Sequence, residues 1–445
     1  MQIFLVGGAV RDQLINKTTH DRDWVVVGAS PAEMLALGYQ QVGRDFPVFL
    51  HPKSKEEHAL ARTERKTAAG YGGFDCYTGS DVTLEEDLLR RDLTINAMAQ
   101  TEDGTIIDPY GGRRDLEARI LRHVSPAFSE DPLRVLRVAR FQARYANDGF
   151  RIADETLALM QTIVTNGEIE HLTAERVWSE TARALLEPSP QRYFETLREC
   201  GALAILLPEL NILWGIPQPE KYHPEIDTGV HTMMALQQGT RLCERLADSL
   251  PEDQSITQTQ AATALMYAIL THDLGKGLTP RHEWPTHHGH ERLSAHLANK
   301  VSDRLGVPAL CRQLAAKTAE YHTHCHRAFE LRPATVMRTL EALDYLRRPA
   351  FLNGFLLACE ADARGRTGYE SEPYPQADYF YAAAANCRQI KASDIQDTLG
   401  FNGKALGEEL RKRRIRKIEQ VRKDFISLTS APTPTSSTTP AGDLN

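Results

Sequence analysis

The stretch IFLVGGAVRDQLINKTTHDRDWVVV, residues 3–27, constrains the fold of this chain more than any other part of it. It starts with an apolar run that ends at Gly7 and Gly8, and Arg11 follows within one helical turn. An apolar run that leads into a glycine turn is typical of a buried strand. The stretch therefore predicts a strand, a tight turn, a helix start and then a second strand, WVVV.

Two carboxylates stand where the second strand begins. Asp21 and Asp23 are two positions apart, so on a strand both side chains point to the same face. Two oxygen ligands that leave room for substrate phosphates suit Mg²⁺. Gly8 lets the backbone approach a phosphate, and Arg11 can bind one through two hydrogen bonds. A glycine turn or a DxD pair alone is usually structural, but the combination predicts metal-assisted phosphoryl or nucleotidyl transfer.

Length and composition exclude several classes of protein. A chain of 445 residues exceeds one domain, and we expect about two to four. No apolar run reaches the length of a membrane span, and the N-terminus lacks a basic leader and a cleavage site. The seven cysteines are scattered without a CxxC pair, which favours reduced thiols in the cytoplasm. The net charge of −7 argues against a basic coat over the whole surface, although local basic stretches can still bind RNA.

Residues 1–125 mix short β-like runs with turns and predict a small α/β head. Within this head, we expect the segment 87–98 to begin an amphipathic helix that brings Arg91 beside the phosphate site. Taken alone, a solvated charge cluster is the better explanation of this segment.

From about residue 126 the pattern becomes helical. A helix start at EDPLR carries Asp131, and Arg134, Arg137, Arg140 and Arg144 follow at spacings that keep them near one face. An arginine stripe is most often a solvated face. However, a carboxylate accepts from the exocyclic amine of cytosine or adenine, and an arginine donates to the same base edge. Asp131 and this stripe therefore predict base recognition without a template strand.

Histidines accumulate in the middle of the chain. The run AATALMYAILTHDLGKG predicts an apolar helix with His272 and Asp273 near its end, and both are costly to bury without a partner. A divalent metal that is also ligated by His231 and by a later carboxylate, for which Asp362 is the candidate, satisfies both. One isolated HD pair is usually a core histidine with a capping aspartate, and the HHGH cluster at 287–290 is a rival source of ligands.

The C-terminal part is again helical. The segment from Lys404 to Lys423 carries nine Lys/Arg against three Glu, which fits an RNA-binding helix or an exposed helix with internal salt bridges equally well. From Leu428 the chain is rich in Pro, Thr and Ser and predicts disorder.

Five motifs in this order resemble one known family. They are LVGGAVRD at 5–12, HDRDWVVVG at 20–28, RRDLTINA at 90–97, EDPLRVLRVARF at 130–141 and HDLGKG at 272–277. The chain resembles the bacterial multifunctional CCA proteins, class II tRNA nucleotidyltransferases with a C-terminal HD domain, from Met1 to about Val421. Each motif is weak alone, but the ordered set is specific.

The resemblance implies an α+β fold whose head belongs to the DNA polymerase beta-like superfamily, followed by an all-helical body. The implied regions are the head at 1–125, a helical neck with base recognition at 126–227, an HD phosphohydrolase domain at 228–329, a helical tRNA-contacting segment at 330–427 and a disordered tail at 428–445.

The resemblance also implies the activity and the site residues. The enzyme would add C, C and A to the tRNA 3′ end from CTP and ATP and release pyrophosphate, with Asp21 and Asp23 as catalytic ligands of Mg²⁺. Nucleotide binding would involve Gly8, Arg11, Arg91, Asp131, Arg134, Arg137 and Arg140, of which Asp131 and Arg134 select the base. The HD domain would add 2′,3′-cyclic phosphodiesterase, 2′-nucleotidase and Ni²⁺-dependent phosphatase activities. We expect a cytoplasmic monomer or dimer that contacts the tRNA acceptor arm and no membrane.

Three other functions remain open at this point. A bacterial poly(A) polymerase shares the glycine turn, the DxD pair and the arginine helix. An HD phosphohydrolase with a degenerate RNA-binding head would leave Arg91 and the arginine stripe without a use, and a non-catalytic RNA-binding scaffold would leave the paired carboxylates unexplained.

Overall fold

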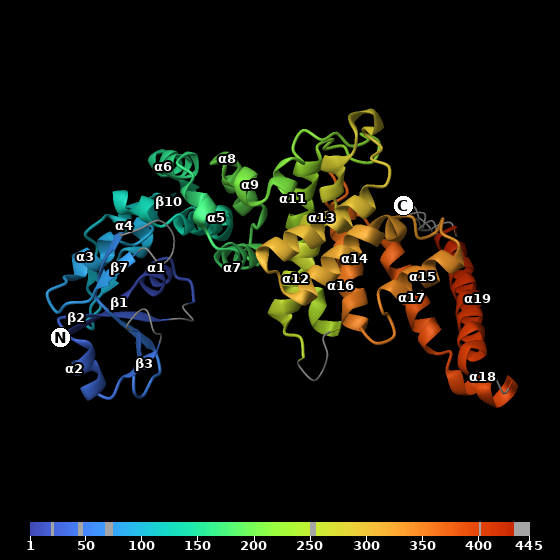
Figure 1. The fold of residues 1–445 in the computed structure, drawn as a ribbon, viewed down its shortest axis with the longest axis horizontal. Helices are drawn as coiled ribbons and strands as arrows, with labels where there is room; N and C mark the ends of the chain where they lie inside the picture. Colours follow the sequence, from blue (N-terminus) through green and yellow to red (C-terminus); the bar gives the residue numbers. More distant parts are fainter. Residues whose placement is uncertain (19–21, 43–47, 67–73, 250–254, 400–401, 431–445) are drawn as a thin grey trace, which may run out of the picture.

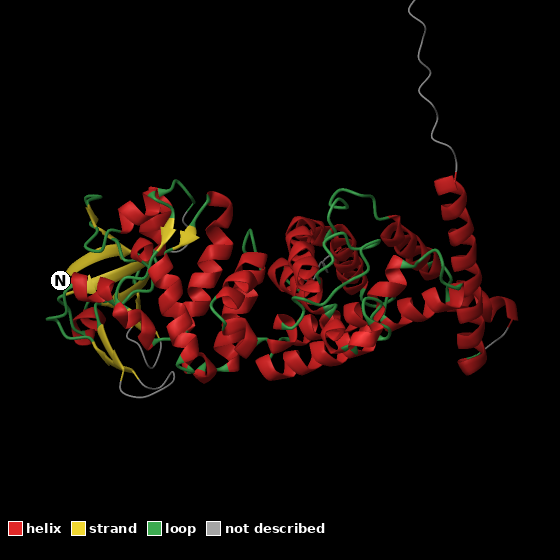
Figure 2. Ribbon diagram, turned by 90° about the horizontal axis from the view of Figure 1, so that it is seen from above, coloured by secondary structure: helices red, strands yellow, loops and turns green. Residues whose placement is uncertain are grey.

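A mixed sheet at the N-terminus and a long series of helices after it form the structure. The computed structural model describes residues 1–18, 22–42, 48–66, 74–249, 255–399 and 402–430. The molecule is elongated, with the sheet at one end and helix α19 near the other (Figure 1). Every strand in the described ranges lies before residue 153, and the rest of the molecule is helical (Figure 2). The predicted α+β class is confirmed.

The head is built around strand β1 (Gln2–Val6). It pairs antiparallel with β2 (Asp23–Val27) and with β8 (Ala99–Gln100), and β2 pairs in parallel with β5 (Glu57–Leu60). Helix α1 (Gly8–Leu14) connects β1 to β2, so the predicted order of strand, turn, helix and strand is confirmed. The sheet has the order β3-β4-β5-β2-β1-β8-β9. The other head elements are α2 (Pro31–Ala36), β3 (Gln40–Val42), β4 (Val48–Leu50), β6 (Thr63–Lys66), β7 (Phe74–Tyr77), α3 (Leu84–Leu89), β9 (Ile106–Ile107), α4 (Gly112–Glu117) and β10 (Ile120–Leu121).

The helix expected to begin in segment 87–98 lies elsewhere, and that prediction is wrong. Helix α3 begins before the segment, because Thr83 caps it and Glu86 bonds back to the Thr83 backbone. It ends at Leu89, and a single 3₁₀ turn at Thr94–Asn96 follows. The segment is therefore a helix end and a loop, which places Arg91 beside the glycine turn without a helix.

The neck begins with helix α5 (Leu133–Tyr145), which carries the arginine stripe. Its apolar face is fully buried through Val135, Val138 and Ala139. The remaining neck elements are β11 (Arg151–Ile152), α6 (Asp154–Thr165), α7 (Ala174–Leu185), α8 (Gln191–Glu199), α9 (Ala202–Leu206) and α10 (Pro208–Asn211).

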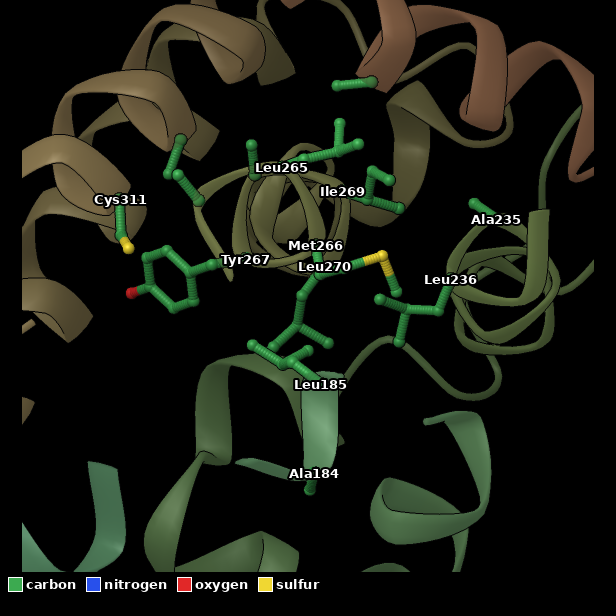
Figure 3. Close-up of a cluster of buried hydrophobic side chains, with 14 of the residues drawn as sticks. Ala184, Leu185, Ala235, Leu236, Leu265, Met266, Tyr267, Ile269, Leu270 and Cys311 are labelled. Atoms are coloured by element: carbon green, nitrogen blue, oxygen red, sulfur yellow. The ribbon is translucent and has the colours of Figure 1, made fainter. Parts of the chain in front are cut away.

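The next body of helices surrounds one apolar helix, α12 (Gln258–Thr271). Its residues from Ala264 to Thr271 are all buried. Figure 3 shows Met266, Tyr267 and Leu270 directed toward Leu236, Cys311 and Leu185 of neighbouring helices. A helix that is apolar on all sides belongs in a core. The helices around it are α11 (Thr228–Leu242), α13 (His290–Leu305), α14 (Ala309–His326) and α16 (Pro349–Arg364), and α15 (Pro333–Ala342) packs against α14 and α19 instead. Because α16 packs against α11, α12 and α14, it brings a late part of the chain into this body.

The chain ends in helices α17 (Pro375–Arg388), α18 (Ala392–Leu399) and α19 (Gly403–Ser430). Helix α19 extends through Leu428 to Ser430, so the predicted disorder from Leu428 is wrong for these residues, and the remaining tail lies outside the described residues. Several basic residues of α19 are paired: Arg411 with Glu341, Arg413 with Glu409 and Lys423 with Glu419. The six cysteines whose side chains are described are free thiols. None of the helices in the described ranges has the length and apolar character to cross a membrane.

Candidate active sites

The ends of strands β1 and β2 bring the glycine turn and the DxD segment together. Val6, the last residue of β1, pairs in register with Asp23, the first residue of β2, and Gly7 follows directly. Asp21 lies outside the described residues. Asp23 also pairs in register with Glu57 of β5, so the carboxylate of Glu57 borders this strand end on the same face as that of Asp23. Sequence reasoning missed Glu57, because only the parallel β2–β5 pairing brings it there.

The turn itself requires glycine at one of its two positions. Gly7 has φ +69° and ψ −128°, a conformation that side chains other than glycine rarely adopt. A Cβ atom on Gly7 would lie 2.9 Å from Nη1 of Arg91, and one on Gly8 would lie 3.4 Å from Nη2 of Arg11. Both arginines therefore lie against the glycine backbone, as the sequence predicted.

Arg11 is held in place by a buried network. It is 3% exposed, and its Nη1 donates to Oδ1 of Asn96 at 2.5 Å. Asn96 Nδ2 donates to Asp92 at 3.0 Å, and Arg137 Nε donates to the other oxygen of Asp92 at 2.8 Å. We call Arg11, Asn96, Asp92 and Arg137 the head network. It links helix α1 to helix α5 through two residues of the RRDLTINA motif that sequence reasoning did not single out.

The charges of the head network support one another. Burial acts to raise the pKa of Asp92, but the Arg137 guanidinium and the hydrogen bond from Asn96 outweigh it, so the pKa of Asp92 lies below its usual range. Further along α5, Arg140 is 7% exposed, and its Nε donates to Glu180 at 2.7 Å. The arginine stripe is therefore largely buried and ion-paired, unlike the solvated face that a lone stripe usually forms.

Asp131 and Arg134, the predicted base-selecting pair, both form hydrogen bonds within the protein. Two hydrogen bonds from Arg176 Nη2, at 3.2 and 2.9 Å, reach the carboxylate of Asp131. Arg134 donates to the backbone carbonyls of Ala127 at 2.8 Å and of Arg90 at 2.6 Å. Arg176 comes from helix α7, 45 positions after Asp131, and no motif in the sequence indicated it.

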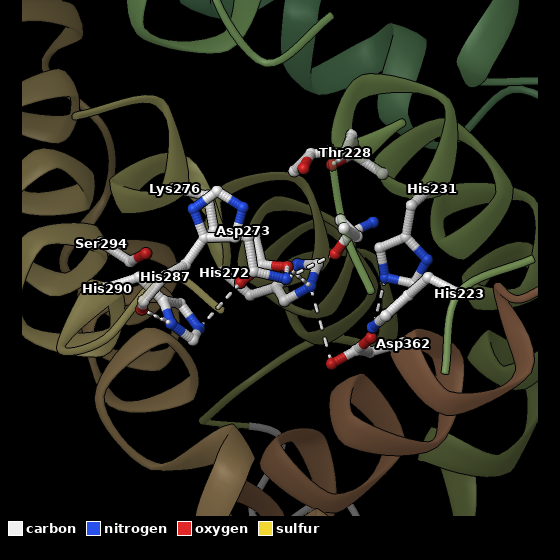
Figure 4. Close-up of polar contacts among 12 residues, drawn as sticks. His223, Thr228, His231, His272, Asp273, Lys276, His287, His290, Ser294 and Asp362 are labelled. Carbon is white, nitrogen blue, oxygen red and sulfur yellow. Dashed lines mark hydrogen bonds and ion pairs between the residues drawn. The ribbon is translucent and has the colours of Figure 1, made fainter. Parts of the chain in front are cut away.

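A second polar cluster lies at the end of the central helix α12. It brings together six buried residues, which we call the histidine centre: His231, His272, Asp273, His290, His322 and Asp362. The His-Asp pair follows directly after the last helical residue, Thr271, as expected from the sequence. Figure 4 shows residues of this centre converging from separate elements.

The four predicted members of the centre lie together. Nε2 of His231 is 2.9 Å from Oδ1 of Asp362, and Nε2 of His272 is 3.6 Å from Oδ2 of Asp362. His272 Nε2 also lies 3.2 Å from Oδ2 of Asp273. Nδ1 of His231 is 2.9 Å from Glu225, a carboxylate that the sequence analysis missed. A carboxylate behind a histidine is the usual support of a histidine that binds a metal.

The rival HHGH cluster contributes one residue to the centre. Nε2 of His290 lies 3.3 Å from Oδ1 of Asp273, and Nε2 of His322 lies 3.5 Å from the same oxygen. His287 is instead held by Thr279 and by the backbone carbonyl of Pro217. His322 stands alone in the sequence inside helix α14, so no motif indicated it.

Electrostatics hold the two carboxylates of the centre in their charged form. Burial acts to raise the pKa of Asp273, but Lys276 and His272 hold the pKa well below its ordinary value. Burial also acts to raise the pKa of Asp362, and His272 and His326 hold it well below the ordinary value. Burial lowers the pKa of His322 to about 3, so this imidazole is neutral at physiological pH. Burial acts to lower the pKa of His231 and of His272, but the carboxylates beside them outweigh it and raise both values. The charged carboxylates of Asp273 and Asp362 and the neutral ring of His322 are in the forms that bind divalent cations.

The histidine centre opens onto a cavity of about 280 Å³. Its walls include Lys276, His223, His326 and Arg366. A wider cleft of about 670 Å³ adjoins it and shares His326 and Arg366. A cation centre beside basic side chains suits a phosphate ester as ligand.

Family models match three parts of the chain. The poly A polymerase head domain matches residues 3–122, the probable RNA and SrmB-binding site of polymerase A matches residues 149–213, and the HD domain matches residues 228–353. The first match covers the sheet and the glycine turn, and the third contains five of the six residues of the histidine centre, all but Asp362.

Solved structures of related proteins share the fold. A CCA-adding enzyme in complex with ATP aligns with a TM-score of 0.62 at 20% identity and covers 97% of this chain and 91% of its own. The Thermotoga maritima CCA-adding enzyme complexed with tRNA aligns with a TM-score of 0.59 at 19% identity over 96% of this chain and 92% of its own.

Curated relatives match at much higher identity over nearly the whole chain. The multifunctional CCA protein of Thioalkalivibrio sulfidiphilus (strain HL-EbGR7) is 58% identical over 96% of this chain and 100% of its own length. That of Hahella chejuensis (strain KCTC 2396) is 55% identical over 95% of this chain and 96% of its own length. The chain belongs to the multifunctional CCA protein family, which combines a nucleotidyltransferase head with an HD domain.

Proposed function

We propose that this protein adds and repairs the 3′-terminal CCA of tRNA, using CTP and ATP without a nucleic-acid template and releasing pyrophosphate. The observation that carries the proposal is the 58% identity to a multifunctional CCA protein over 96% of the chain. The glycine turn beside Asp23 and the buried arginines around it support the same chemistry.

Asp21 and Asp23 are the proposed magnesium ligands of the head. Carboxylate oxygens fit Mg²⁺, and the β1–β2 register places Asp23 directly beside the turn that would hold the triphosphate. Asp21 and Asp23 would hold Mg²⁺ there, and the ion would neutralise charge on the triphosphate and favour attack by the 3′-hydroxyl. Gly8 presents backbone N–H groups to the phosphates. Arg11 and Arg91, both against the glycine backbone, bind phosphate oxygens and orient the pyrophosphate as leaving group.

Asp131 and Arg134 are the proposed base-selecting pair. Their side chains offer one acceptor and one set of donors, which complements the edges of cytosine and adenine. Arg176 orients the Asp131 carboxylate, and the carbonyls of Ala127 and Arg90 orient Arg134. Arg137 and Arg140 extend the nucleotide site along α5. Their ion pairs with Asp92 and Glu180 hold the two side chains in place.

We further propose that the HD domain hydrolyses phosphate esters, with 2′,3′-cyclic phosphodiesterase, 2′-nucleotidase and phosphatase activities and Ni²⁺ favoured for the last. His231, His272, Asp273 and Asp362 offer imidazole nitrogens and carboxylate oxygens, a donor set that suits first-row divalent metals. Such a cation supplies an activated water and polarises the phosphoryl oxygen. Lys276 and Arg366 bind the remaining phosphate oxygens from the cavity wall.

The helical remainder is the proposed tRNA-binding part, and we propose that the protein works in the cytoplasm as a monomer or a dimer. The head alone is too small to hold a tRNA. Exposed basic residues of α19 such as Lys412 and Arg416 would contact the phosphates of the acceptor arm and recognise shape more than sequence.

The test uses purified protein, Mg²⁺ and a tRNA that lacks its last three nucleotides, with each nucleoside triphosphate offered singly and then in pairs. Incorporation of C, C and A that then stops supports the proposal. The absence of any incorporation, with phosphatase activity retained, contradicts it and makes the head an RNA-binding module of a phosphohydrolase.

Poly(A) synthesis is the second candidate, because the family model that matches the head is described as the poly A polymerase head domain. The same assay separates the two activities. A long A tail made from ATP alone on this tRNA identifies a poly(A) polymerase, whereas a single A added only after two C identifies CCA addition.

A further inference from the structure

We propose that Phe141 is a positioning residue for the triphosphate of CTP and ATP. Phe141 is the last residue of the motif EDPLRVLRVARF, and its ring is buried and acts through other side chains. The ring holds the guanidinium groups of three arginines of the proposed nucleotide site: Arg11, Arg137 and Arg140. This role rests on the proposed nucleotide addition, to which it adds a side chain that sets how tightly the triphosphate is bound.

The ring of Phe141 lies close to all three guanidinium groups. The Cζ atoms of Arg140, Arg11 and Arg137 are 5.1, 5.3 and 5.9 Å from the ring centroid. Within about 6 Å, the negative face of an aromatic ring attracts a cation, and the attraction is stronger where water is excluded. Phe141, Arg11 and Arg140 are at most 7% exposed, so water is largely excluded from their contacts.

A second ring extends this surface. Tyr145, one helical turn after Phe141, stacks on it with centroids 6.3 Å apart and ring planes 6° from parallel. We call these two residues the aromatic pair. Several cationic side chains of the described residues lie within about 6 Å of one of its centroids: Arg11, Lys17, Arg137, Arg140 and Arg144. Significant contacts of this kind occur about once per 70–80 residues, so their concentration on two neighbouring rings exceeds what chance packing gives.

Each of the three guanidinium groups also has a carboxylate partner. The pairs are Arg11 with Asp12 at 2.8 Å, Arg137 with Asp92 at 2.7 Å and Arg140 with Glu180 at 2.7 Å. A guanidinium has five N–H donors, so a carboxylate that accepts from one or two of them leaves others for a phosphate. A guanidinium that is fixed by both a carboxylate and a ring loses less freedom when a phosphate binds, and this preorganisation strengthens binding.

Tyr145 connects the aromatic pair to the helix that carries Arg11. Its hydroxyl donates to Oδ1 of Asp12 at 3.0 Å, and the same oxygen accepts from Nε of Arg11 at 2.8 Å. Burial raises the pKa of Tyr145, so the phenol keeps the proton that it donates. The aromatic pair therefore joins helix α5 to helix α1 at the arginine that lies against the glycine turn.

Phe141 also packs in the hydrophobic core, so positioning has to be separated from packing. Phe150 belongs to the same core, and its ring centroid lies 5.1 Å from that of Tyr145. None of the cation–ring contacts of the described residues involves Phe150. Phe150→Leu therefore removes a ring of the same size from the same core without removing a contact to an arginine, which makes it the matched control for Phe141→Leu.

The experiment measures the binding of inorganic tripolyphosphate, with Mg²⁺ present, to the full-length chain by isothermal titration calorimetry. All proteins carry Asp273→Asn, which removes a proposed ligand of the histidine centre and limits binding there. Phe141→Leu should weaken tripolyphosphate binding about tenfold, because the attraction between the ring and the guanidinium groups is lost. Phe150→Leu should leave the binding unchanged.

A fluorinated ring supplies the second variant. Trifluorophenylalanine incorporated at Phe141 keeps the shape of the ring but removes most of the negative charge of its face. Tripolyphosphate binding should weaken by a factor similar to that in Phe141→Leu, while the melting temperature stays near that of the wild type. This variant decides the question if circular dichroism shows that Phe141→Leu is unfolded.

Kinetics supply a readout that loss of structure would not give. With a tRNA that lacks its last three nucleotides, the KM for CTP should rise in the fluorinated protein by the same factor as the dissociation constant of tripolyphosphate. The KM for this tRNA should remain unchanged, because the ring acts only on the arginines of the triphosphate site. A general loss of structure would change both KM values.

The outcomes separate this role from the proposed activity. Equal weakening in Phe141→Leu and Phe150→Leu, unchanged binding in the fluorinated protein, or no binding of tripolyphosphate to the parent protein would overturn the positioning role, and CCA addition can persist in each case. Binding that weakens in the fluorinated protein supports the positioning role, even if no nucleotide is added to tRNA and the proposed activity fails.

Discussion

The head and the histidine centre contain similar numbers of buried charged groups but satisfy them in opposite ways. In the head network, each donor meets an acceptor: Arg11 meets Asn96, Asn96 meets Asp92, and Asp92 meets Arg137. In the histidine centre, Nε2 of His272 and Nε2 of His290 lie close to the carboxylate of Asp273 without hydrogen bonds to any described residue. The first arrangement is complete within the protein, whereas the second leaves buried polar atoms without partners among the described residues.

The two arrangements imply different origins for the specificity of the two sites. A closed network holds arginines at fixed positions before a nucleotide arrives, so discrimination rests on geometry built into the fold. If the histidine centre binds the proposed cation, the ion would fix the positions of its side chains, and the proposed phosphohydrolase activity would depend on the metal supplied. The two sites should therefore respond differently to mutation.

The largest expected effect separates the two sites completely. We expect Asp21→Ala to abolish nucleotide addition and to leave phosphatase activity unchanged, and Asp273→Asn to do the reverse, because the sites lie in separate domains. Both activities are measured on the same preparations. Loss of both activities in either variant, with circular dichroism unchanged, would show that the two sites are coupled and would contradict their independence.

Substitutions at the base-reading pair should reduce discrimination rather than phosphate binding. Asp131→Ala removes the acceptor, and Arg176→Ala removes the group that orients it. We expect incorporation of GTP and UTP relative to CTP to rise about tenfold in both variants, the equivalent of one charge-assisted hydrogen bond. Single-turnover assays with each triphosphate measure this ratio. An equal rise in KM for every triphosphate would instead assign Asp131 to general binding.

Breaking the head network should destabilise the head in a pH-dependent way. The pKa of Asp92 is lower in the folded protein than the unfolded value of about 3.9, so its stabilising effect is present above pH of about 4 and is lost as pH falls through the folded pKa. We expect Asp92→Asn to cost about 2 kcal/mol at pH 7, less than for a fully buried pair because Arg137 is half-buried.

Scanning calorimetry of the full chain at pH 7 and pH 3 measures this effect. The difference between the wild type and Asp92→Asn should shrink at the lower pH. A difference that is the same at both pH values would mean that Asp92 acts through packing rather than through its charge. The transition that belongs to the head is identified by its shift on adding ATP.

Substitutions at the two glycines of the turn should differ from each other, and the change in stability for Gly8→Ala should be the smallest of all. Gly7→Ala forces a Cβ atom to within 2.9 Å of Arg91 at φ +69°, and we expect a cost of about 1–3 kcal/mol in stability. Gly8→Ala meets Arg11 only at 3.4 Å and should leave stability nearly unchanged while it raises KM for ATP and CTP. Melting temperature and KM are compared for the two variants. If both variants lost stability equally, Gly7 would not be the one position of the turn where the backbone conformation requires glycine, and the proposed nucleotide-binding role of Gly8 would lose its support.

Local patterns in the sequence determined the strands and helices around the two sites. They also determined the glycine turn with Asp23 in the head and the His272-Asp273 pair in the histidine centre. The apolar run before Gly7 and the β-branched run after Asp23 specify two strands and a turn, because strand and turn preferences act over a few residues. The apolar run before His272 specifies a core helix that ends in a His-Asp pair. The expected helix start in segment 87–98 was wrong because the capping signal at Thr83 and Glu86, a local signal too, was overlooked.

The packing of the folded chain selects which distant residues complete the sites. Glu57 reaches Asp23 through a parallel strand pair, and Arg176 reaches Asp131 across 45 positions. His322 joins Asp273 because helix α14 packs against α12 and α13. No short-range pattern encodes these contacts, because they follow from how helices and strands pack to bury their apolar faces. The sequence therefore determined which chemical groups are present, and the packing of the fold decided which of them can act together.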